Sequence, residues 1–248
     1  ELRLVAMSAT LDGAHLAGLM GGAPVIESAG RSHPVEIVHL GRRAERRIED
    51  ELAGAVRRAL TEREGGVLAF LPGVAEIERT AERLGDLPAD VELHRLHGMA
   101  ERAAQRAAIA AAPPHKRKLV LATSIAETSL TLDGVRVVVD SGLARRPRYD
   151  RGAGITRLVT ERAGRAGRQA PGTVYRLWEE AGTASLPRFD PPEILKADLS
   201  ALVLDCAIWG VADPRTMRWL DPPPEAALRE ARVRLLALAA LDEDGRPT

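Results

Sequence analysis

The chain has 248 residues, of which 45% are apolar, so it has room for one large domain or for a medium-sized domain and a smaller one. Its 35 Lys and Arg residues balance 35 Asp and Glu residues, which excludes a global field that would attract nucleic acid or a membrane. Any anion site must therefore be local. Cys206 is the single cysteine, which excludes an internal disulfide. Because the sequence also shows no signal peptide and no apolar run of membrane length, we expect a soluble cytoplasmic protein.

The predicted elements begin with a buried strand over residues 2–7, and a chain that opens within a strand is expected to be a fragment. Short, continuously apolar runs predict further strands at residues 35–40, 67–70, 91–96, 119–122, 135–139, 155–159 and 173–177. Apolar residues at helical spacing predict helices at residues 45–64, 74–84 and 100–112. Continuously apolar strands that are separated by helices indicate a mostly parallel sheet covered by helices on both faces.

In a mostly parallel sheet, ligands bind outside the carboxyl ends of the strands. Functional residues are therefore expected directly after each predicted strand. The segments at these positions are Ser8–Thr10, Leu71–Gly73, His97–Gly98, Thr123–Thr128, Asp140–Gly142 and Thr160–Arg168. Of these, Asp140–Gly142 is more typical of a turn than of a nucleophile.

The segment Thr160–Arg168 has the sequence T-E-R-A-G-R-A-G-R, with an arginine at every third position. Guanidinium groups are always charged and donate two hydrogen bonds at once, so they suit phosphate groups. They can also neutralise the charge that develops on a transferring phosphoryl group. In a protein whose basic residues are nearly all arginine, the same pattern is also typical of a solvated basic turn. The other motifs of the chain have to decide between the two.

The composition changes near residue 187, where proline-rich stretches alternate with apolar helical patterns over residues 191–206 and 225–241. This change predicts a small helical domain after the sheet domain, with the boundary between residues 182 and 190. The histidines show no metal-ligand spacing, and Cys206 lies on an apolar helical face. No metal site is therefore expected.

Four segments, taken in chain order, resemble motifs from the second half of a superfamily 2 helicase of the DEAH/RHA class. S-A-T resembles motif III, F-L-P-G motif IV, A-T-S-I-A-E-T-S-L-T motif V and R-A-G-R-A-G-R motif VI. They occupy Ser8–Thr10, Phe70–Gly73, Ala122–Thr131 and Arg162–Arg168. The tail with its W-G-V-A-D-P and W-L-D-P-P-P segments is similar to the winged-helix domain of bacterial HrpB-type helicases.

The resemblance implies an α/β fold, namely a RecA-like lobe of the P-loop NTPase helicase type with a mostly parallel sheet, followed by a small helical or winged-helix domain. It divides the chain into three parts. Residues 1–28 are the end of a first RecA-like lobe and its linker, residues 29–186 a second lobe, and residues 187–248 an incomplete winged-helix region.

The resemblance also implies roles for residues on the nucleotide side. Arg165 and Arg168 are the arginine fingers that stabilise the transition state of ATP hydrolysis. Arg162, Asp133 and Gly134 contact the nucleotide. In the family an aromatic residue stacks on the adenine. None follows the strand at residues 35–40, so Arg42 or Arg43 is expected to stack there instead.

On the nucleic-acid side, the resemblance implies contacts to the sugar-phosphate backbone, which carry no sequence information. The residues are Pro72, Gly73, His97, Gly98, Thr123 and Ser124. Thr123 and Ser124 also suit a cap for the next helix, and the two roles are compatible. Ser8, Ala9 and Thr10 would couple the two lobes.

Some family features are missing from the sequence. It contains neither G-x-x-x-x-G-K-[ST] nor D-E-x-H, the motifs that hold ATP with Mg²⁺ and activate water. The resemblance places both in the first lobe, so this chain alone is expected to be inactive. Glu161 stands where the family has Gln, and a polar, alanine-rich stretch before the arginines is absent through a deletion or missing residues.

The sequence thus predicts the C-terminal part of an ATP-dependent RNA helicase. This part would grip single-stranded nucleic acid, expected to be RNA, and would supply arginine fingers for ATP hydrolysis coupled to translocation and unwinding. The alternative is a non-catalytic module that binds nucleic acid or a protein partner and keeps a helicase-like lobe.

Overall fold

The structure is a computed structural model, and it describes residues 4–7, 13–27, 33–43, 45–127, 132–143, 159–183 and 192–248. These residues form two compact units. An α/β unit takes the described residues from 33 to 183, and a smaller unit takes those from 4 to 27 and from 192 to 248. Within this part of the chain, no helix is both long enough and apolar enough to span a bilayer.

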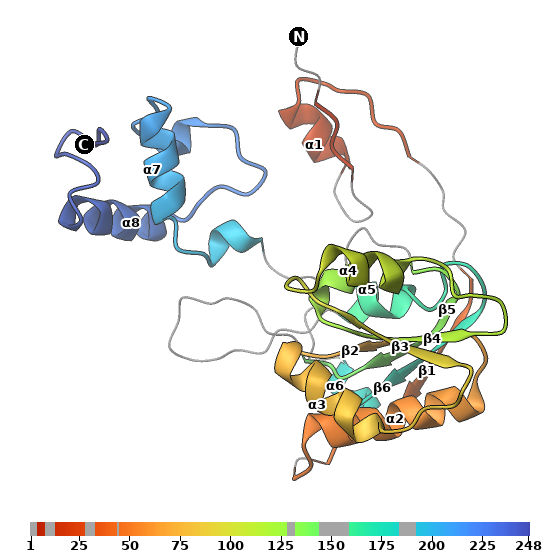
Figure 1. Cartoon of the computed structure of the whole chain (residues 1–248). Helices are drawn as coiled ribbons and strands as arrows, with labels where there is room; N and C mark the ends of the chain where they lie inside the picture. Colours follow the sequence, from red (N-terminus) through yellow and green to blue (C-terminus); the bar gives the residue numbers. More distant parts are fainter. Residues whose placement is uncertain are drawn as a thin grey trace. The chain divides into compact units, whose positions relative to one another are not determined.

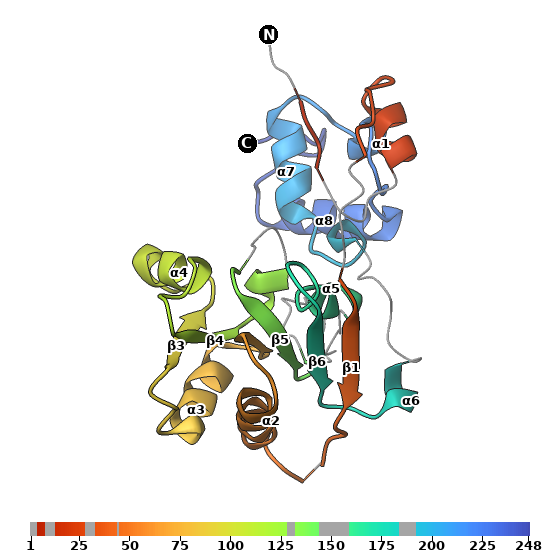
Figure 2. The same cartoon turned by 90° about the vertical axis from the view of Figure 1, so that its right-hand side faces the viewer.

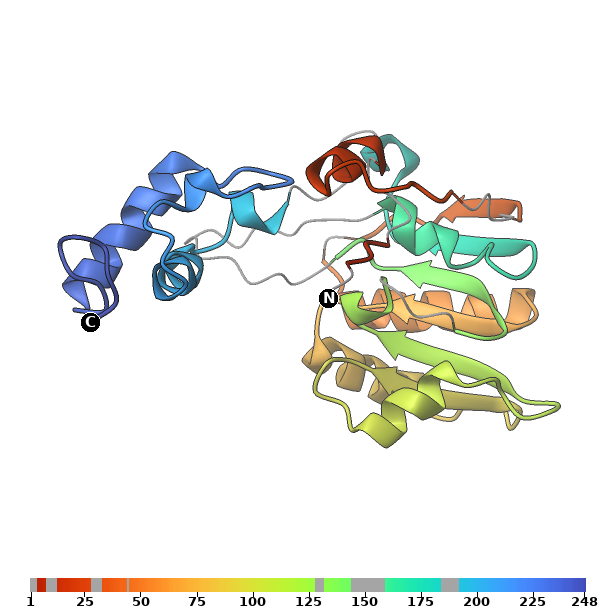
Figure 3. The same cartoon turned by 90° about the horizontal axis from the view of Figure 1, so that it is seen from above.

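A six-stranded sheet forms the centre of the α/β unit, in the order β1-β6-β5-β2-β4-β3. The strands are β1 (Val35–His39), β2 (Gly66–Phe70), β3 (Val91–Leu96), β4 (Arg117–Ala122), β5 (Val135–Asp140) and β6 (Gly172–Arg176). All pairings are parallel. Figure 2 shows β1, β6 and β5 side by side, and Figure 3 shows β1 and β3 at the two margins. The predicted parallel sheet is confirmed.

Helices cover both faces of the sheet (Figure 1). On one face lie α2 (Ile48–Glu62) and α3 (Val74–Leu84), and on the other α4 (Arg102–Ile109) and α5 (Val159–Gly164). In β2, Val67 and Ala69 belong to the first apolar core, whereas Leu68 and Phe70 belong to the second. This alternation is the period of two along a strand. Because both faces are covered, every residue of β2 is buried.

Two of the predicted strands differ from the structure. Residues 4–7 form no strand, and Leu4, Val5 and Met7 are 71–89% exposed. A strand needs a hydrogen-bonded neighbour, and no strand of the described chain pairs with these residues. Val159, predicted as the end of a strand, begins helix α5 instead. Residues 155–158 lie outside the described residues.

The smaller unit is mainly helical. Its elements are α1 (Gly13–Leu19), η2 (Glu193–Leu195), α7 (Ser200–Ile208), η3 (Pro214–Thr216) and α8 (Glu225–Ala237). Val203 of α7 packs with Leu228 and Leu235 of α8 in a small apolar core. The assignment of this unit as a winged-helix region, and the three-part division of the chain, stay predictions.

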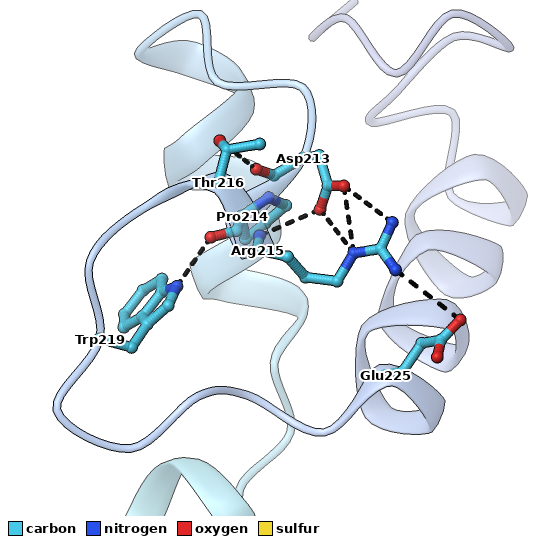
Figure 4. A network of polar contacts seen from close by, with 6 residues as sticks. All are labelled: Asp213, Pro214, Arg215, Thr216, Trp219 and Glu225. Atoms are coloured by element: carbon cyan, nitrogen blue, oxygen red, sulfur yellow. Dashed lines mark hydrogen bonds and ion pairs between the residues drawn. The ribbon is translucent and has the colours of Figure 1, made fainter.

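A polar network holds the loop between α7 and α8 (Figure 4). The Asp213 carboxylate accepts a hydrogen bond of 3.0 Å from the Arg215 amide and pairs with the Arg215 guanidinium at 2.8 Å. The same guanidinium lies 3.8 Å from Glu225, the first residue of α8. The Trp219 indole donates to the Pro214 carbonyl at 2.7 Å. These contacts lower the pKa of Asp213, chiefly through its hydrogen bond with Arg215.

Two cations at the start of β4 satisfy carbonyl groups that helix ends leave without partners. The Arg117 guanidinium donates to the carbonyls of Leu60, Arg63 and Gly65, at 2.9, 2.6 and 3.1 Å, at the end of α2. The Lys118 ammonium donates to the last carbonyls of α4 on the other face. Burial lowers the pKa of Lys118. The sheet is thus fastened to a helix on each face.

We expect Arg117→Met to lower the free energy of unfolding by about 2–3 kcal/mol, because it leaves three carbonyls without a charged donor. Arg95→Met is the matched control, because Arg95 pairs with Glu78 on the surface, with side chains 43% and 47% exposed. Its cost should stay below about 1 kcal/mol. Urea denaturation measures both, and equal losses in the two variants would contradict the role assigned to Arg117.

Candidate nucleotide and nucleic-acid site

The loops after β2, β3, β4 and β5 lie at one edge of the sheet, the carboxyl edge, because these strands are parallel neighbours. Backbone hydrogen bonds extend the sheet into the loops. The Leu71 amide donates to Ala122 at 2.8 Å, and the Thr123 amide donates to Leu96 at 3.1 Å. The structure therefore brings together all the predicted nucleic-acid contacts, which are Pro72, Gly73, His97, Gly98, Thr123 and Ser124.

Two of these loops also start helices. Gly73 is the extended residue before α3, and the Thr123 carbonyl accepts a 3.2 Å hydrogen bond from the Ala126 amide in η1 (Ser124–Glu127). The predicted helix start at Thr123 is thus present in the backbone. Thr123 and Ser124 are both partly exposed, which leaves a role in contacting a ligand open to them.

The segment Asp140–Gly142 is a turn at the same edge, as predicted. The Asp140 carboxylate accepts a hydrogen bond of 2.8 Å from the Gly142 amide, and the Leu143 amide donates to the Ser141 hydroxyl at 3.2 Å. Gly142 has a φ of 70°, which glycine adopts at little cost. Both Asp140 and Ser141 are buried, so this turn belongs to the core.

The arginine segment corrects one expectation. It was expected at the carboxyl edge, directly after a strand, but only its beginning lies there, where Arg162 contacts Asp140. The chain then returns across the face of the sheet, and the His33 amide, just before β1, donates to Gly167 at 2.9 Å. Arg168 therefore lies toward the amino edge, and Arg165 lies between it and Arg162, because a crossover between parallel strands has to run back along the sheet.

Glycines allow the end of this segment to press against the sheet. A Cβ atom on Gly167 would lie 2.7 Å from the His33 carbonyl oxygen, and one on Gly172 would overlap the Ala166 carbonyl oxygen. Gly164 differs, because a Cβ atom there would meet open space. Only two of these three glycines are thus required by close approach.

The predicted nucleotide contacts other than Arg162 come together near the amino edge. Arg165 and Arg168 line a small hollow beside Leu68, Leu132, Val135 and Gln169. Arg165 is buried, whereas Arg168 is exposed. Gln169 joins this hollow to the start of β5, because its amide nitrogen donates to Asp133 at 2.8 Å and its amide oxygen accepts from the Gly134 amide at 2.9 Å.

Sequence reasoning missed Gln169. The signal available was a polar amide directly after the third arginine. Asp133 and Gly134 in turn line a pocket of about 360 Å³ with Ala111, Ala112 and other residues at the amino ends of the strands.

Arg162 occupies a different place from the nucleotide contact that was predicted for it. Its side chain is 1% exposed, and its guanidinium donates to Asp140 at 2.7 Å and to the Leu143 carbonyl at 3.3 and 3.4 Å. It also lies 4.8 Å above the Phe70 ring. Protein groups thus enclose the guanidinium, and the nucleotide-contact prediction does not fit this position.

The predicted adenine stacking concerns Arg42 and Arg43. Both residues are exposed and follow β1, at the carboxyl edge. Gly167 pairs with the chain before β1, and five strand residues span about 16 Å. Because the adenine and the γ-phosphate lie at opposite ends of ATP, this separation does not decide whether Arg42 or Arg43 stacks on the base, and the stacking stays a prediction.

Other predicted residues give less information. Ser8, Ala9 and Thr10 lie outside the described residues, so their coupling role stays a prediction. No group of three His, Cys, Asp or Glu side chains in the described ranges is placed to hold a metal ion.

A six-stranded parallel sheet covered by helices on both faces, with arginines on the crossover before β6, is the arrangement of a RecA-like helicase lobe. Residues 47–170 match the family described as the helicase conserved C-terminal domain. The chain belongs to this family.

Individual relatives agree with this assignment. The chain is 43% identical to the ATP-dependent RNA helicase HrpB of Escherichia coli (strain K12), over 98% of this chain and 31% of that protein. It is 33% identical to the pre-mRNA-splicing factor ATP-dependent RNA helicase prp22 of Schizosaccharomyces pombe, over 99% of this chain and 22% of that protein. The crystal structure of the Escherichia coli DEAH/RHA helicase HrpB superimposes with a TM-score of 0.88 at 42% identity, over 98% of this chain and 32% of that one. The chain thus spans less than a third of the length of these relatives, and the predicted resemblance is confirmed.

The tight packing at Gly172 yields a stability test. Gly172→Ala should lower the free energy of unfolding by about 1–3 kcal/mol, because its Cβ atom would overlap the Ala166 carbonyl and lie 2.6 Å from the Arg136 carbonyl. Gly164→Ala is the control within the same segment, and it should be neutral or stabilising by up to about 1 kcal/mol. Chemical denaturation compares the two. A neutral Gly172→Ala variant would show that the arginine segment is not held against the sheet.

Proposed function

We propose that this chain supplies the second RecA-like lobe of an ATP-dependent RNA helicase, together with the start of its winged-helix region. The observation that carries the proposal is the separation of two groups of residues on one sheet. Arginines and Asp133 gather toward the amino edge, and the loops with Thr123 and Ser124 gather at the carboxyl edge. One lobe can thus hold a nucleotide and a nucleic acid at separate places.

On the nucleotide side, the described residues fit ATP. Arg168 is exposed, and the buried Arg165 lines the same small hollow. Both guanidiniums would neutralise charge on the phosphates, and the ribose would lie toward the pocket of about 360 Å³ at Asp133 and Gly134. ATP would supply the phosphoanhydride bond, and it would be held with Mg²⁺ mainly by the lobe that precedes this one. The two arginines would act when the lobes close, which makes turnover depend on closure.

On the nucleic-acid side, Thr123 and Ser124 would bind phosphate and sugar oxygens through hydroxyl groups and loop amides. Pro72, Gly73, His97 and Gly98 would line the same path. Such contacts hold a strand without reading its sequence. RNA is the proposed partner because the relatives are named as RNA helicases. Ser8, Ala9 and Thr10 would relay between the lobes.

We also place the protein in the cytoplasm. The free, buried Cys206 supports this location, because a reducing compartment keeps thiols unpaired.

The finger assignment is tested in the full-length protein, whose coding sequence upstream of this chain should contain G-x-x-x-x-G-K-[ST] and D-E-x-H. Arg165→Ala or Arg168→Ala should lower ATP turnover by about a thousandfold or more while ATP binding is largely kept, because a finger acts on the transition state. Steady-state ATPase and equilibrium binding of a non-hydrolysable ATP analogue measure the two quantities.

Arg58→Ala on α2 is the control. Arg58 is half exposed, pairs with Glu62 of the same helix, and lies on the face of the sheet opposite to α5. Its turnover should equal that of the wild type. Unchanged turnover in both finger variants would refute the assignment. If the upstream motifs are missing, the proposed helicase activity is refuted, and the alternative function as a non-catalytic binding module is favoured.

The nucleic-acid contact is tested separately. Thr123→Ala should raise the RNA concentration needed for half-maximal ATPase stimulation about 5- to 30-fold, through loss of a hydrogen bond to phosphate. Thr61→Ala is the matched control, because the Thr61 hydroxyl bonds only to the Arg57 carbonyl of its own helix in the described structure. An RNA titration that is the same for both variants would rule out the contact at Thr123.

A further inference from the structure

Arg162 has the largest of the fully buried side chains in the described part of the chain. A buried cation is costly unless it is paired and its donors are satisfied. Here Asp140, itself 2% exposed, accepts at 2.7 Å, the Leu143 carbonyl accepts from both terminal nitrogens, and the Phe70 ring lies under the guanidinium. The group is therefore held in one orientation by contacts from three sides.

Asp140 also lies beside a second buried arginine in the sheet. It pairs in register with Arg176 on β6, and Arg176 is 6% exposed. Burial lowers the pKa of Arg176, and the charge of Asp140 opposes this shift. The Asp140 carboxylate thus forms an ion pair with Arg162 and lies in register with a second buried arginine.

The pair also lies at one of two fixed points of the finger segment. The Arg165 amide donates to the Arg162 carbonyl at 3.2 Å, so the anchor and the first finger share one turn. At the other end, the His33 amide holds Gly167 at 2.9 Å. Arg165 lies between the two points, and a shift of either one changes where it is aimed.

The anchor is next to the predicted nucleic-acid edge. Phe70, which stacks on Arg162, is the last residue of β2 and directly precedes the Leu71–Gly73 loop. The Ser141 amide, next to Asp140, donates to the Phe70 carbonyl at 3.4 Å. A movement of these loops therefore reaches Arg162 through direct contacts.

We propose that Arg162 is a positioning residue and not a nucleotide ligand, and that its ion pair with Asp140 links the nucleic-acid edge of the lobe to the aim of Arg165 and Arg168. This inference rests on the proposed helicase function. It differs from that function in assigning the coupling to two buried side chains that touch neither ATP nor RNA.

The test uses Arg162→Gln, Asp140→Asn and the double variant in the full-length protein. Each single variant should lower the RNA-stimulated kcat about 10- to 100-fold, because a small misplacement of a catalytic group has such effects. The KM for ATP and the affinity for a non-hydrolysable analogue should stay within about threefold. The kcat of the double variant should be no lower than that of the slower single variant, because both substitutions remove the same Arg162–Asp140 ion pair.

Arg79→Gln is the control for lost stability, since Arg79 pairs with Glu49 and Glu76 on the opposite face of the sheet. It should lower the thermal unfolding midpoint and leave kcat unchanged. Should Asp140→Asn fail to fold, Arg162→Lys replaces it, because lysine keeps the charge but loses the planar fork. Its kcat should fall while its unfolding midpoint stays near that of the wild type.

Three results would overturn the positioning role. The first is that Arg162→Gln weakens binding of the ATP analogue while Asp140→Asn leaves kcat unchanged. The second is that the losses of kcat in the two single variants multiply in the double variant, and the third is that Arg79→Gln lowers kcat as much as Arg162→Gln does. A wild-type protein without RNA-stimulated ATPase would overturn the proposed function and this inference together. An active wild type with unaffected Arg162 and Asp140 variants would overturn this inference alone.

Discussion

The constraint on which the rest of the structure depends is the common direction of the six strands. Parallel strands place all their carboxyl ends at one edge, and each connection has to return to the other edge before the next strand begins. The loop with Thr123 and the end of the crossover segment at Gly167 therefore lie at opposite edges of the sheet. Any communication between them has to pass along a strand or along the crossover itself.

The sheet was predictable because burial on both faces leaves a local trace. The run of apolar residues in β2 is buried at every position, and it needs no knowledge of its neighbours to be recognised as a strand. Residues 4–7 are equally apolar but are exposed and unpaired with any described strand. An apolar run thus indicates that a segment has to be covered by other apolar residues, and it does not indicate that a strand of the described sheet covers it.

The candidate site was only partly predictable, for a related reason. Arg162, Arg165 and Arg168 are alike in sequence, yet the first is enclosed in the core and the last is exposed. What separates them is Asp140, 22 residues before Arg162, which captures the first guanidinium at the carboxyl edge. Spacing along the chain carries no information about a carboxylate that arrives from another strand. Motif resemblance assigned Arg165 and Arg168 as arginine fingers and Arg162 as a nucleotide contact, and it gave no sign that Arg162 is enclosed in the core.

The enclosure of Arg162 bears on why an ion pair is found there at all. A buried ion pair is weak support for stability, since apolar residues of similar volume often fill such a site equally well. Apolar side chains, however, pack without a preferred direction. A planar guanidinium between Asp140, the Leu143 carbonyl and the Phe70 ring has one orientation, and the helix that carries it inherits that orientation. Arg165 lies on the next turn of the same segment. A fixed orientation of this segment therefore matters more than the additional stability that an apolar residue at position 162 would give.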